Sequence, residues 1–357
     1  MTIYIKSDFL CNSFCECQKI LQPFSNTTSF PVWCPTMSLL RLLVLVCAGV
    51  NEKIRQVSKV IFGHYFDPQR DIVLVTGGSS GLGKEMVRCF AAKGAVVIVY
   101  DLKIPDQNDA IPGVHYYAGD VSNRHQIFHL RKQIKQDFGI VTVLINNAAI
   151  SKGMSLVELS FKDIEKTIQV NLISSFYTIK TFLPDMIKTK RGYIVTIASV
   201  LGYMSPARLS VYGASKSGLI ALHESLTYEL GPPSLNPYGI KTLLVCPGQL
   251  QTGMFDYITT PSSLFAPELD PKYVAKSVLR AIELGKRGEI KLPAYSKILP
   301  VFRALPWPVT ELARNISGID RSINTIKSAI SLLTSPSTTS TSPVSNTGNS
   351  ANVQGVN

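Results

Sequence analysis

The chain has 357 residues, of which 45% are apolar and only 17% charged, so it can bury a large core and is not disordered as a whole. Its net charge is +12, but the basic residues are scattered and form neither a long Lys/Arg run nor a nucleic-acid-binding motif. Nucleic acid is therefore excluded as an expected partner, whereas a mildly positive body suits contact with anionic lipid.

The first 65 residues predict an N-terminal extension. Residues 1–36 show neither helical nor strand periodicity, and Met37, which could be the working start, is followed by an apolar run at 38–50. This run is shorter than the roughly 20 residues that span a bilayer, and it lacks the flanks of a secretory signal. We therefore expect a monotopic membrane anchor; a helix packed on the domain is the alternative.

From residue 66 onward, apolar segments alternate with helical ones. Strands are predicted at 72–75, 95–100, 114–117, 141–145, 192–198, 240–246 and 289–292, and helices at 82–93, 122–137, 161–189, 211–230 and 271–285. Ser160 and Asp163 predict a capping box for the 161–189 helix. Strands that are apolar on both faces and alternate with helices indicate a parallel sheet covered on both sides. We predict one Rossmann-like, doubly wound α/β domain of about seven strands over 66–295.

The composition changes after Pro293. Over 296–334, apolar residues recur in steps of three and four, at Leu312, Ile316, Ile319, Ile323, Ile326, Ile330 and Leu333. Such a stripe predicts an amphipathic helix that must bury one face against a membrane, a partner chain or the domain itself. The Ser/Thr-rich residues 335–357 predict a disordered tail.

A glycine-rich turn joins the first predicted strand to the first helix. Residues 76–83 read Thr-Gly-Gly-Ser-Ser-Gly-Leu-Gly. Gly77 allows a sharp turn, Gly81 allows a pyrophosphate to approach the main chain, and Gly83 allows close packing of the helix on the sheet. The helix N-terminus then offers free N–H groups to the phosphates, so this turn predicts a dinucleotide site.

Asp101 ends the second predicted strand, where a carboxylate can accept hydrogen bonds from the adenosine ribose. It would repel a 2′-phosphate, which favours NAD(H). Lys84, Arg88 and Lys103 lie nearby in the sequence and could weaken this preference, so NADP(H) remains possible.

Three residues further along form the pattern Ser-x12-Tyr-x3-Lys. Tyr212 and Lys216 are one helical turn apart and share a face. Ser199 follows an apolar strand at its carboxyl end, the end where open α/β sheets bind ligands. Each residue alone would be ordinary, but together they indicate acid–base chemistry beside a nucleotide.

With these residues in hand, the chain resembles the short-chain dehydrogenase/reductase family over about 66–295. Within the family it looks most like membrane-associated retinol and 17β-hydroxysteroid dehydrogenase-like members. Two positions depart slightly from the family pattern, because Ala149 replaces a common glycine and Leu82 stands where isoleucine is frequent. The segments that carry the resemblance are 76–83, 146–149, Asn171, Ser199, 212–216 and 247–252.

The resemblance implies a mechanism. Tyr212 would exchange a proton with the substrate oxygen while hydride passes to or from nicotinamide. Lys216 would supply an ammonium that favours the phenolate, and Ser199 would hold the reacting oxygen. Asn171 would orient a water that links Lys216 to solvent.

The resemblance also implies how the cofactor lies. Asp120 and Val121 would approach the adenine, Asn147 the adenosine, and Leu250 and Thr252 the nicotinamide carboxamide. The complete expected cofactor set is Gly77, Ser80, Gly81, Leu82, Gly83, Asp101, Asp120, Val121, Asn147, Ala148, Tyr212, Lys216, Leu250 and Thr252.

The segment after Thr252 is long, apolar and Pro-bearing, which is typical of an active-site lid. With Tyr203 and Met204 after Ser199, it predicts a hydrophobic alcohol or carbonyl substrate, such as a lipid, sterol or retinoid. We expect a homodimer or tetramer by family analogy. The expected location is intracellular, on the cytosolic side of the endoplasmic reticulum or a lipid droplet, with the cytoplasm as the alternative.

Two rival functions share these motifs. One is an NADP(H)-dependent lipid ketone reductase, and the other is a regulatory protein that binds NAD(H) without turnover. Metal catalysis is not expected, because the five histidines form no His-Glu-x-x-His motif and the N-terminal run Cys11, Cys15, Cys17 lacks a second pair at zinc spacing.

Overall fold

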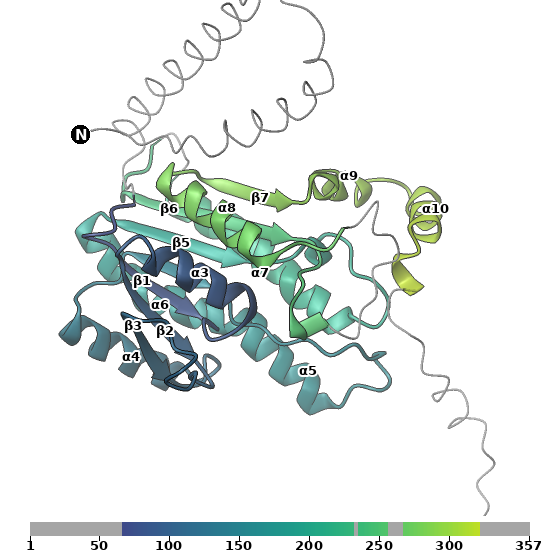
Figure 1. Cartoon of the computed structure of the whole chain (residues 1–357). Coiled ribbons are helices and arrows are strands. Elements are labelled where there is room, and N and C mark those ends of the chain that lie inside the picture. Colours follow the sequence, from purple (N-terminus) through teal and green to yellow (C-terminus); the bar gives the residue numbers. More distant parts are fainter. Residues whose placement is uncertain (1–65, 232–234, 256–266, 322–357) are drawn as a thin grey trace, which may run out of the picture. The chain divides into compact units, whose positions relative to one another are not determined.

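Seven strands form one parallel sheet in the order β3-β2-β1-β4-β5-β6-β7 (Figure 1). The computed structural model describes residues 66–231, 235–255 and 267–321. The strands are β1 Ile72–Thr76, β2 Val96–Asp101, β3 Val114–Ala118, β4 Val143–Asn146, β5 Gly192–Ile197, β6 Ile240–Pro247 and β7 Gly288–Leu292. The chain builds outward from β1 to β3 and then returns to the centre at β4. The carboxyl ends of β1 and β4 therefore flank the switch point where doubly wound sheets bind ligands.

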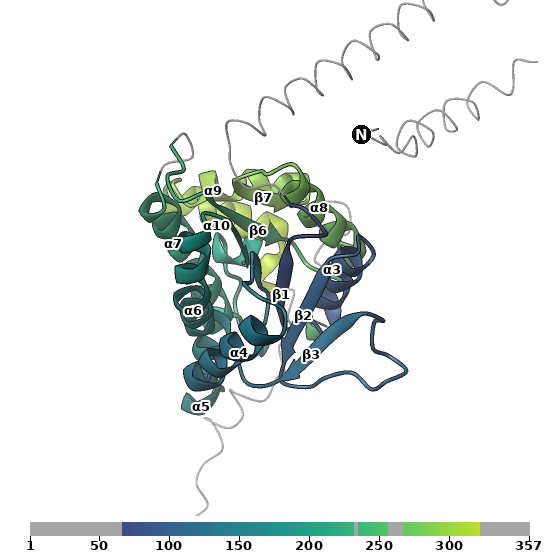
Figure 2. The same ribbon diagram turned by 90° about the vertical axis from the view of Figure 1, so that its left-hand side faces the viewer.

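Helices cover both faces of the sheet (Figure 2). One face carries α3 (Gly81–Ala91) and α8 (Pro271–Glu283). The opposite face carries α4 (Arg124–Asp137), α6 (Ser174–Thr189) and α7 (Ser210–Glu229). The prediction of a doubly wound, Rossmann-like α/β domain is confirmed.

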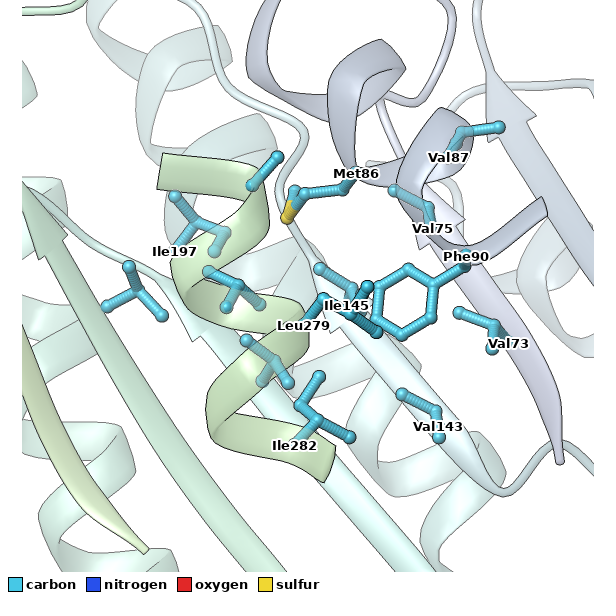
Figure 3. Packing of buried hydrophobic residues seen from close by; sticks show 14 of the residues in the cluster. Val73, Val75, Met86, Val87, Phe90, Val143, Ile145, Ile197, Leu279 and Ile282 are labelled. Atoms are coloured by element: carbon cyan, nitrogen blue, oxygen red, sulfur yellow. The ribbon is translucent and has the colours of Figure 1, made fainter. Parts of the chain in front are cut away.

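The apolar runs of the strands supply both halves of the core. Along β1, Val73 and Val75 point into the layer under α3 and α8, whereas Ile72 and Leu74 point into the opposite layer. In the first layer the Phe90 ring of α3 packs among these valines and side chains from β4 and α8 (Figure 3). Because successive strand residues face opposite sides, a strand covered on both sides must be apolar throughout.

The predicted 161–189 helix is interrupted. It forms as α5 (Phe161–Ile168), a π-helical turn at Gln169–Ile173, and α6. The predicted cap is present, because Ser160 Oγ accepts a hydrogen bond from the N–H of Asp163 at 3.1 Å. Single π turns inside α-helices are frequent at functional sites, and this one contains Asn171.

The C-terminal helix is shorter than the stripe predicted. After α9 (Leu299–Phe302), α10 covers Trp307–Ser317 and ends at Gly318, whose φ of +64° is the left-handed cap typical of glycine. The prediction of one continuous helix over 312–333 is therefore wrong, because the helix ends before Gly318. Residues beyond 321 lie outside the described part. The expected anchor at 38–50 and the tail at 335–357 also lie outside it. Within the described ranges, no helix is long and apolar enough to cross a bilayer.

Candidate active site

A cavity of about 400 Å³ opens at the carboxyl edge of the sheet, next to the switch point. Its walls come from the loops after β1, β2, β3, β4, β5 and β6 and from α5, the π turn and α7. All fourteen residues expected to bind the cofactor line it, and so does Ser199. The structure thus brings together residues from Gly77 to Thr252 that are far apart in the sequence.

The glycine-rich turn forms the wall at the start of α3. Gly81 has φ +52°, and a Cβ on Gly83 would lie 2.0 Å from the main-chain oxygen of Gly77. Asn147 braces the turn, because its Nδ2 donates to the oxygens of Thr76 and Gly77 at 3.1 and 2.9 Å. The side chain of Ser80 does not cap the helix. The first N–H groups of α3 are therefore left for another acceptor beside the cavity.

Asp101 lies at the end of β2 and lines the cavity. Its carboxylate accepts hydrogen bonds from the N–H groups of Ser79, at 2.9 Å, and Leu102, at 2.7 Å. These bonds tie it to the glycine-rich turn. Nearby, Lys84 pairs with Asp109 at 2.5 Å.

A cation that sequence reasoning missed lies at the next part of the wall. Lys166, on α5, donates to Asp120 at 2.7 Å and to Ser122 Oγ at 3.0 Å. The hydrogen bonds from Lys166 and Ser122 lower the pKa of Asp120, although burial opposes them as the largest single effect. Because 46 residues separate Lys166 from Asp120, no local pattern pointed to the pair.

Ser199, Tyr212 and Lys216 meet at the other end of the cavity. All three are buried, with 6%, 5% and 2% of their surface exposed. Lys216 Nζ donates to the main-chain oxygen of Ile197 at 2.9 Å and lies 5.6 Å from the centre of the Tyr212 ring. Burial lowers the pKa of Lys216 to about 8 from its ordinary 10.5. Ser199 Oγ accepts from the N–H of Leu201 at 3.1 Å.

Asn171 does not line the cavity but lies behind it. It is 1% exposed, and its side-chain oxygen accepts from the N–H of Ile150 at 2.8 Å. Its Nδ2 donates to the oxygen of Ile150 at 2.9 Å and to Ser215 Oγ at 3.1 Å. Asn171 therefore joins the loop after β4 to the residue next to Lys216.

Tyr203 and Met204 do not line the cavity, contrary to the sequence prediction. The Tyr203 hydroxyl donates a hydrogen bond to Glu289 on β7, the edge strand, so this side chain is directed toward the edge of the sheet and not into the cavity. Met254, from the predicted segment after Thr252, lines the cavity. Further apolar lining comes from residues that were not predicted to face substrate: Ala149, Ile150, Val170, Ala198 and Pro247. Of the predicted lid at 253–267, Gly253 and Met254 line the cavity, and residues 256–266 lie outside the described part.

The cavity suits a dinucleotide. The absence of a Cβ at Gly83 lets the start of α3 pack directly on the glycine-rich turn, and the uncapped N–H groups of α3 suit phosphate oxygens. The carboxylates of Asp101 and Asp120 suit the hydroxyl groups of a nucleoside.

Comparison with known proteins agrees with this geometry. The short chain dehydrogenase family model matches residues 71–262. An uncharacterized oxidoreductase of Saccharomyces cerevisiae is 38% identical over 261 residues, covering 72% of this chain and 85% of that protein. Retinol dehydrogenase 10 of Homo sapiens is 31% identical over 315 residues, covering 78% of this chain and 89% of that protein.

Among solved structures, a short-chain dehydrogenase from Streptomyces avermitilis matches with a TM-score of 0.58 at 23% identity, over 70% of this chain and 98% of that one. At this identity the likeness concerns the fold alone. The family-model match and the identities to the curated relatives settle the assignment. The chain belongs to the short-chain dehydrogenase/reductase family, with retinol dehydrogenase-like relatives, and is an NAD(P)(H)-binding oxidoreductase that acts on CH–OH donors.

Proposed function

We propose that the protein interconverts a hydrophobic alcohol and its carbonyl with NAD(H), using Tyr212, Lys216, Ser199 and Asn171. One observation carries the proposal. A single cavity holds the glycine-rich turn at one end and the buried Ser199, Tyr212 and Lys216 at the other. Nucleotide binding and proton transfer can thus take place side by side.

Tyr212 is the proposed acid and base. Its hydroxyl would donate a proton to a carbonyl oxygen, or remove one from an alcohol, when the substrate oxygen lies between it and Ser199. Bound nicotinamide would supply or accept the hydride. Ser199, already oriented by the N–H of Leu201, would hold the reacting oxygen in place.

Lys216 would act on Tyr212 through its charge. With its pKa lowered to about 8, it is still mostly an ammonium at neutral pH. Its hydrogen bond to the oxygen of Ile197 holds that charge close to the Tyr212 ring. A fixed positive charge beside the phenol stabilises the phenolate more than the neutral form.

Asn171 would act mainly as a positioning residue. Its side-chain amide is engaged by Ile150 and Ser215. A water relay at this point would therefore use main-chain groups of the π turn rather than the Asn171 side chain. The side chain itself would hold the cavity wall and α7 at a fixed spacing.

The charges around Asp101 support NAD(H) over NADP(H). The Asp101 carboxylate lines the cavity and would repel a 2′-phosphate. Of the three nearby cations that could offset it, Lys84 pairs with Asp109 and Arg88 pairs with Glu85 at 2.7 Å. The third, Lys103, is exposed and does not line the cavity.

The cavity wall near Ser199 supports a hydrophobic substrate. Ile150, Ala198, Pro247 and Met254 present mainly apolar atoms there. The named activity of the human relative, retinol dehydrogenase, is consistent with a long apolar alcohol. Such a substrate dissolves in lipid, so we also propose that the enzyme works at a membrane surface.

Nicotinamide absorbance tests the proposal directly. Purified protein with NAD⁺ should oxidise long-chain or ring-bearing apolar alcohols faster than small polar alcohols, and more efficiently than with NADP⁺. Tyr212→Phe should abolish turnover and leave cofactor affinity nearly unchanged. Preference for small polar alcohols would refute the substrate class, and cofactor binding without turnover of any alcohol or carbonyl would point to a regulatory protein.

A further inference from the structure

The helix α10 carries its apolar stripe on the outside. Val309, Leu312 and Ile316, spaced three and four apart, are 45%, 60% and 79% exposed. On the opposite side, Arg314 is turned toward the domain, where it donates to the oxygen of Ser205 at 3.1 Å and pairs with Asp320. An amphipathic helix on a globular domain normally buries its apolar stripe. In α10 the apolar stripe faces outward instead, and the side that carries Arg314 faces the domain.

The apolar surface extends onto the preceding segment. Ile298, just before α9, is 56% exposed, and Val301, within α9, is 58% exposed. Trp307 at the start of α10 is 78% exposed. We call this set, together with Leu305 and the α10 stripe, the α9–α10 surface. Scattered exposed apolar residues are ordinary, but so many within the 19 residues from Ile298 to Ile316 indicate an interaction site.

The α9–α10 surface is fixed next to the active site. Figure 1 shows α9 and α10 beyond the arrowhead of β7, at the edge where the carboxyl ends of the strands lie. Arg303 donates to the oxygen of Gly202 at 3.3 Å, and Asp320 accepts from the N–H of Ala207 at 2.9 Å. Both partners belong to the segment that follows Ser199.

A second link joins this surface to the cavity wall. Gly248, which lines the cavity, lies against Pro293 and Tyr295, and a Cβ at position 248 would meet both at 3.0–3.1 Å. The α9–α10 surface begins three residues after Tyr295, at Ile298. Whatever covers this surface is therefore held close to the cavity.

We infer that the α9–α10 surface docks on an anionic lipid bilayer. Tryptophan beside aliphatic side chains is the composition that favours the membrane interface. The charge also fits, because Lys297 and Arg303 are exposed at the surface, and Glu311 is the only acidic residue between 297 and 317. The same positive charges disfavour docking of a second copy.

This inference deepens the proposed function. A hydrophobic substrate dissolved in the bilayer would reach a cavity whose wall is attached to the docking surface. The docking itself does not depend on turnover, so it can be tested independently of the substrate.

Trp307 provides a local probe in the full-length chain. The chain has two tryptophans, Trp33 and Trp307, so Trp33→Phe leaves Trp307 as the sole emitter. On vesicles of phosphatidylcholine with phosphatidylserine, its emission should shift to the blue and be quenched by brominated lipid. Vesicles of phosphatidylcholine alone should give a weaker effect, and added salt should reduce binding to the anionic vesicles.

Matched variants test whether the surface drives binding. Replacing Leu312 and Ile316 by serine should lower vesicle affinity about tenfold or more. The control replaces Val157 and Phe161 by serine; these are 87% and 85% exposed near α5 and should leave affinity unchanged. Both pairs are solvent-exposed, so both variants should fold, as circular dichroism would verify.

Three results would overturn the inference. One is flotation of the protein with vesicles without quenching of Trp307, which would place the membrane contact elsewhere, as at 38–50. Another is Trp307 emission that is already blue before lipid is added and does not change with lipid, which would show that the chain covers its own surface. The last is emission that depends on protein concentration rather than lipid, which would indicate a second copy. Any of these results, together with turnover of apolar alcohols, would refute the docking but not the proposed function.

Discussion

The Nζ atom of Lys216 lies 5.6 Å from the centre of the Tyr212 ring, inside a site where both side chains are almost fully buried. Among the described residues no carboxylate pairs with this lysine, and its hydrogen bond goes to the main-chain oxygen of Ile197. The buried ammonium is therefore a source of electrostatic stabilisation for the proposed phenolate and a cost to the fold. Function and stability should oppose each other at this position.

Lys216→Met tests that opposition. The kcat of the variant should fall about a hundredfold or more, which is the usual effect of removing a group that stabilises charge in the transition state. It should also raise the free energy of unfolding at pH 7 by about 1–2 kcal/mol, because methionine can be buried without desolvating a charge. Chemical denaturation measures the second effect, and a destabilised variant would contradict it.

The same lysine gives a pH signature. Its pKa is about 8 in the folded protein and 10.5 when exposed. Between these values the unfolded state binds a proton that the folded state does not, so stability should rise with pH across this window. The rise should be smaller in Lys216→Met than in the native protein. Parallel curves for the two proteins would show that Lys216 does not titrate in this range.

His223 should make the stability of the protein depend on pH in the acidic range. It is 7% exposed on α7, and burial lowers its pKa to about 4 from 6.5. The unfolded state therefore binds the extra proton between pH 6.5 and 4, and stability should fall by about 2–3 kcal/mol as the pH falls through this window. His223→Gln should flatten the curve. His125→Gln, on the exposed face of α4, is the control and should leave it unchanged.

Gly83 and Gly81 should respond differently to alanine. At Gly83 the new Cβ would lie 2.0 Å from the oxygen of Gly77 and 2.6 Å from Nδ2 of Asn147, so the turn must open. We expect a loss of about 3 kcal/mol in stability and weak cofactor binding. Gly81→Ala meets only Thr252, at 3.4 Å, and should cost about 1–2 kcal/mol for its positive φ. Thermal unfolding and cofactor titration separate the two, and equal effects would contradict the packing argument.

Asp101 should set the cofactor preference. Asp101→Asn keeps an acceptor for the N–H of Ser79 but removes the charge that repels a 2′-phosphate. The ratio of kcat/KM for NAD⁺ over NADP⁺ should fall by at least about tenfold, the effect of a modest charge interaction at a partly exposed site. Asp109→Ala, which releases Lys84, serves as the comparison and should change the ratio less. An unchanged ratio in Asp101→Asn would assign the preference to other residues.

The sequence alone determined the features that depend on local chemistry. Apolar runs such as 72–75 predicted strands because a sheet covered on both sides needs apolar side chains on both faces. The glycine-rich turn and the Tyr212–Lys216 spacing predicted the cavity residues because turn geometry and helical periodicity act over a few residues. Tyr212 and Lys216 line the cavity, and so do the turn residues expected to bind the cofactor: Gly77, Ser80, Gly81, Leu82 and Gly83.

Only the tertiary structure decided the features that depend on distant partners. The Asn171 side chain joins Ile150 to Ser215, and the Lys166–Asp120 pair and the contact of Tyr203 with Glu289 likewise join segments that no local pattern relates. At α10, periodicity predicted an amphipathic helix but not which face would be buried. In the tertiary structure Arg314 faces the domain, where it donates to the oxygen of Ser205, and the apolar stripe faces outward.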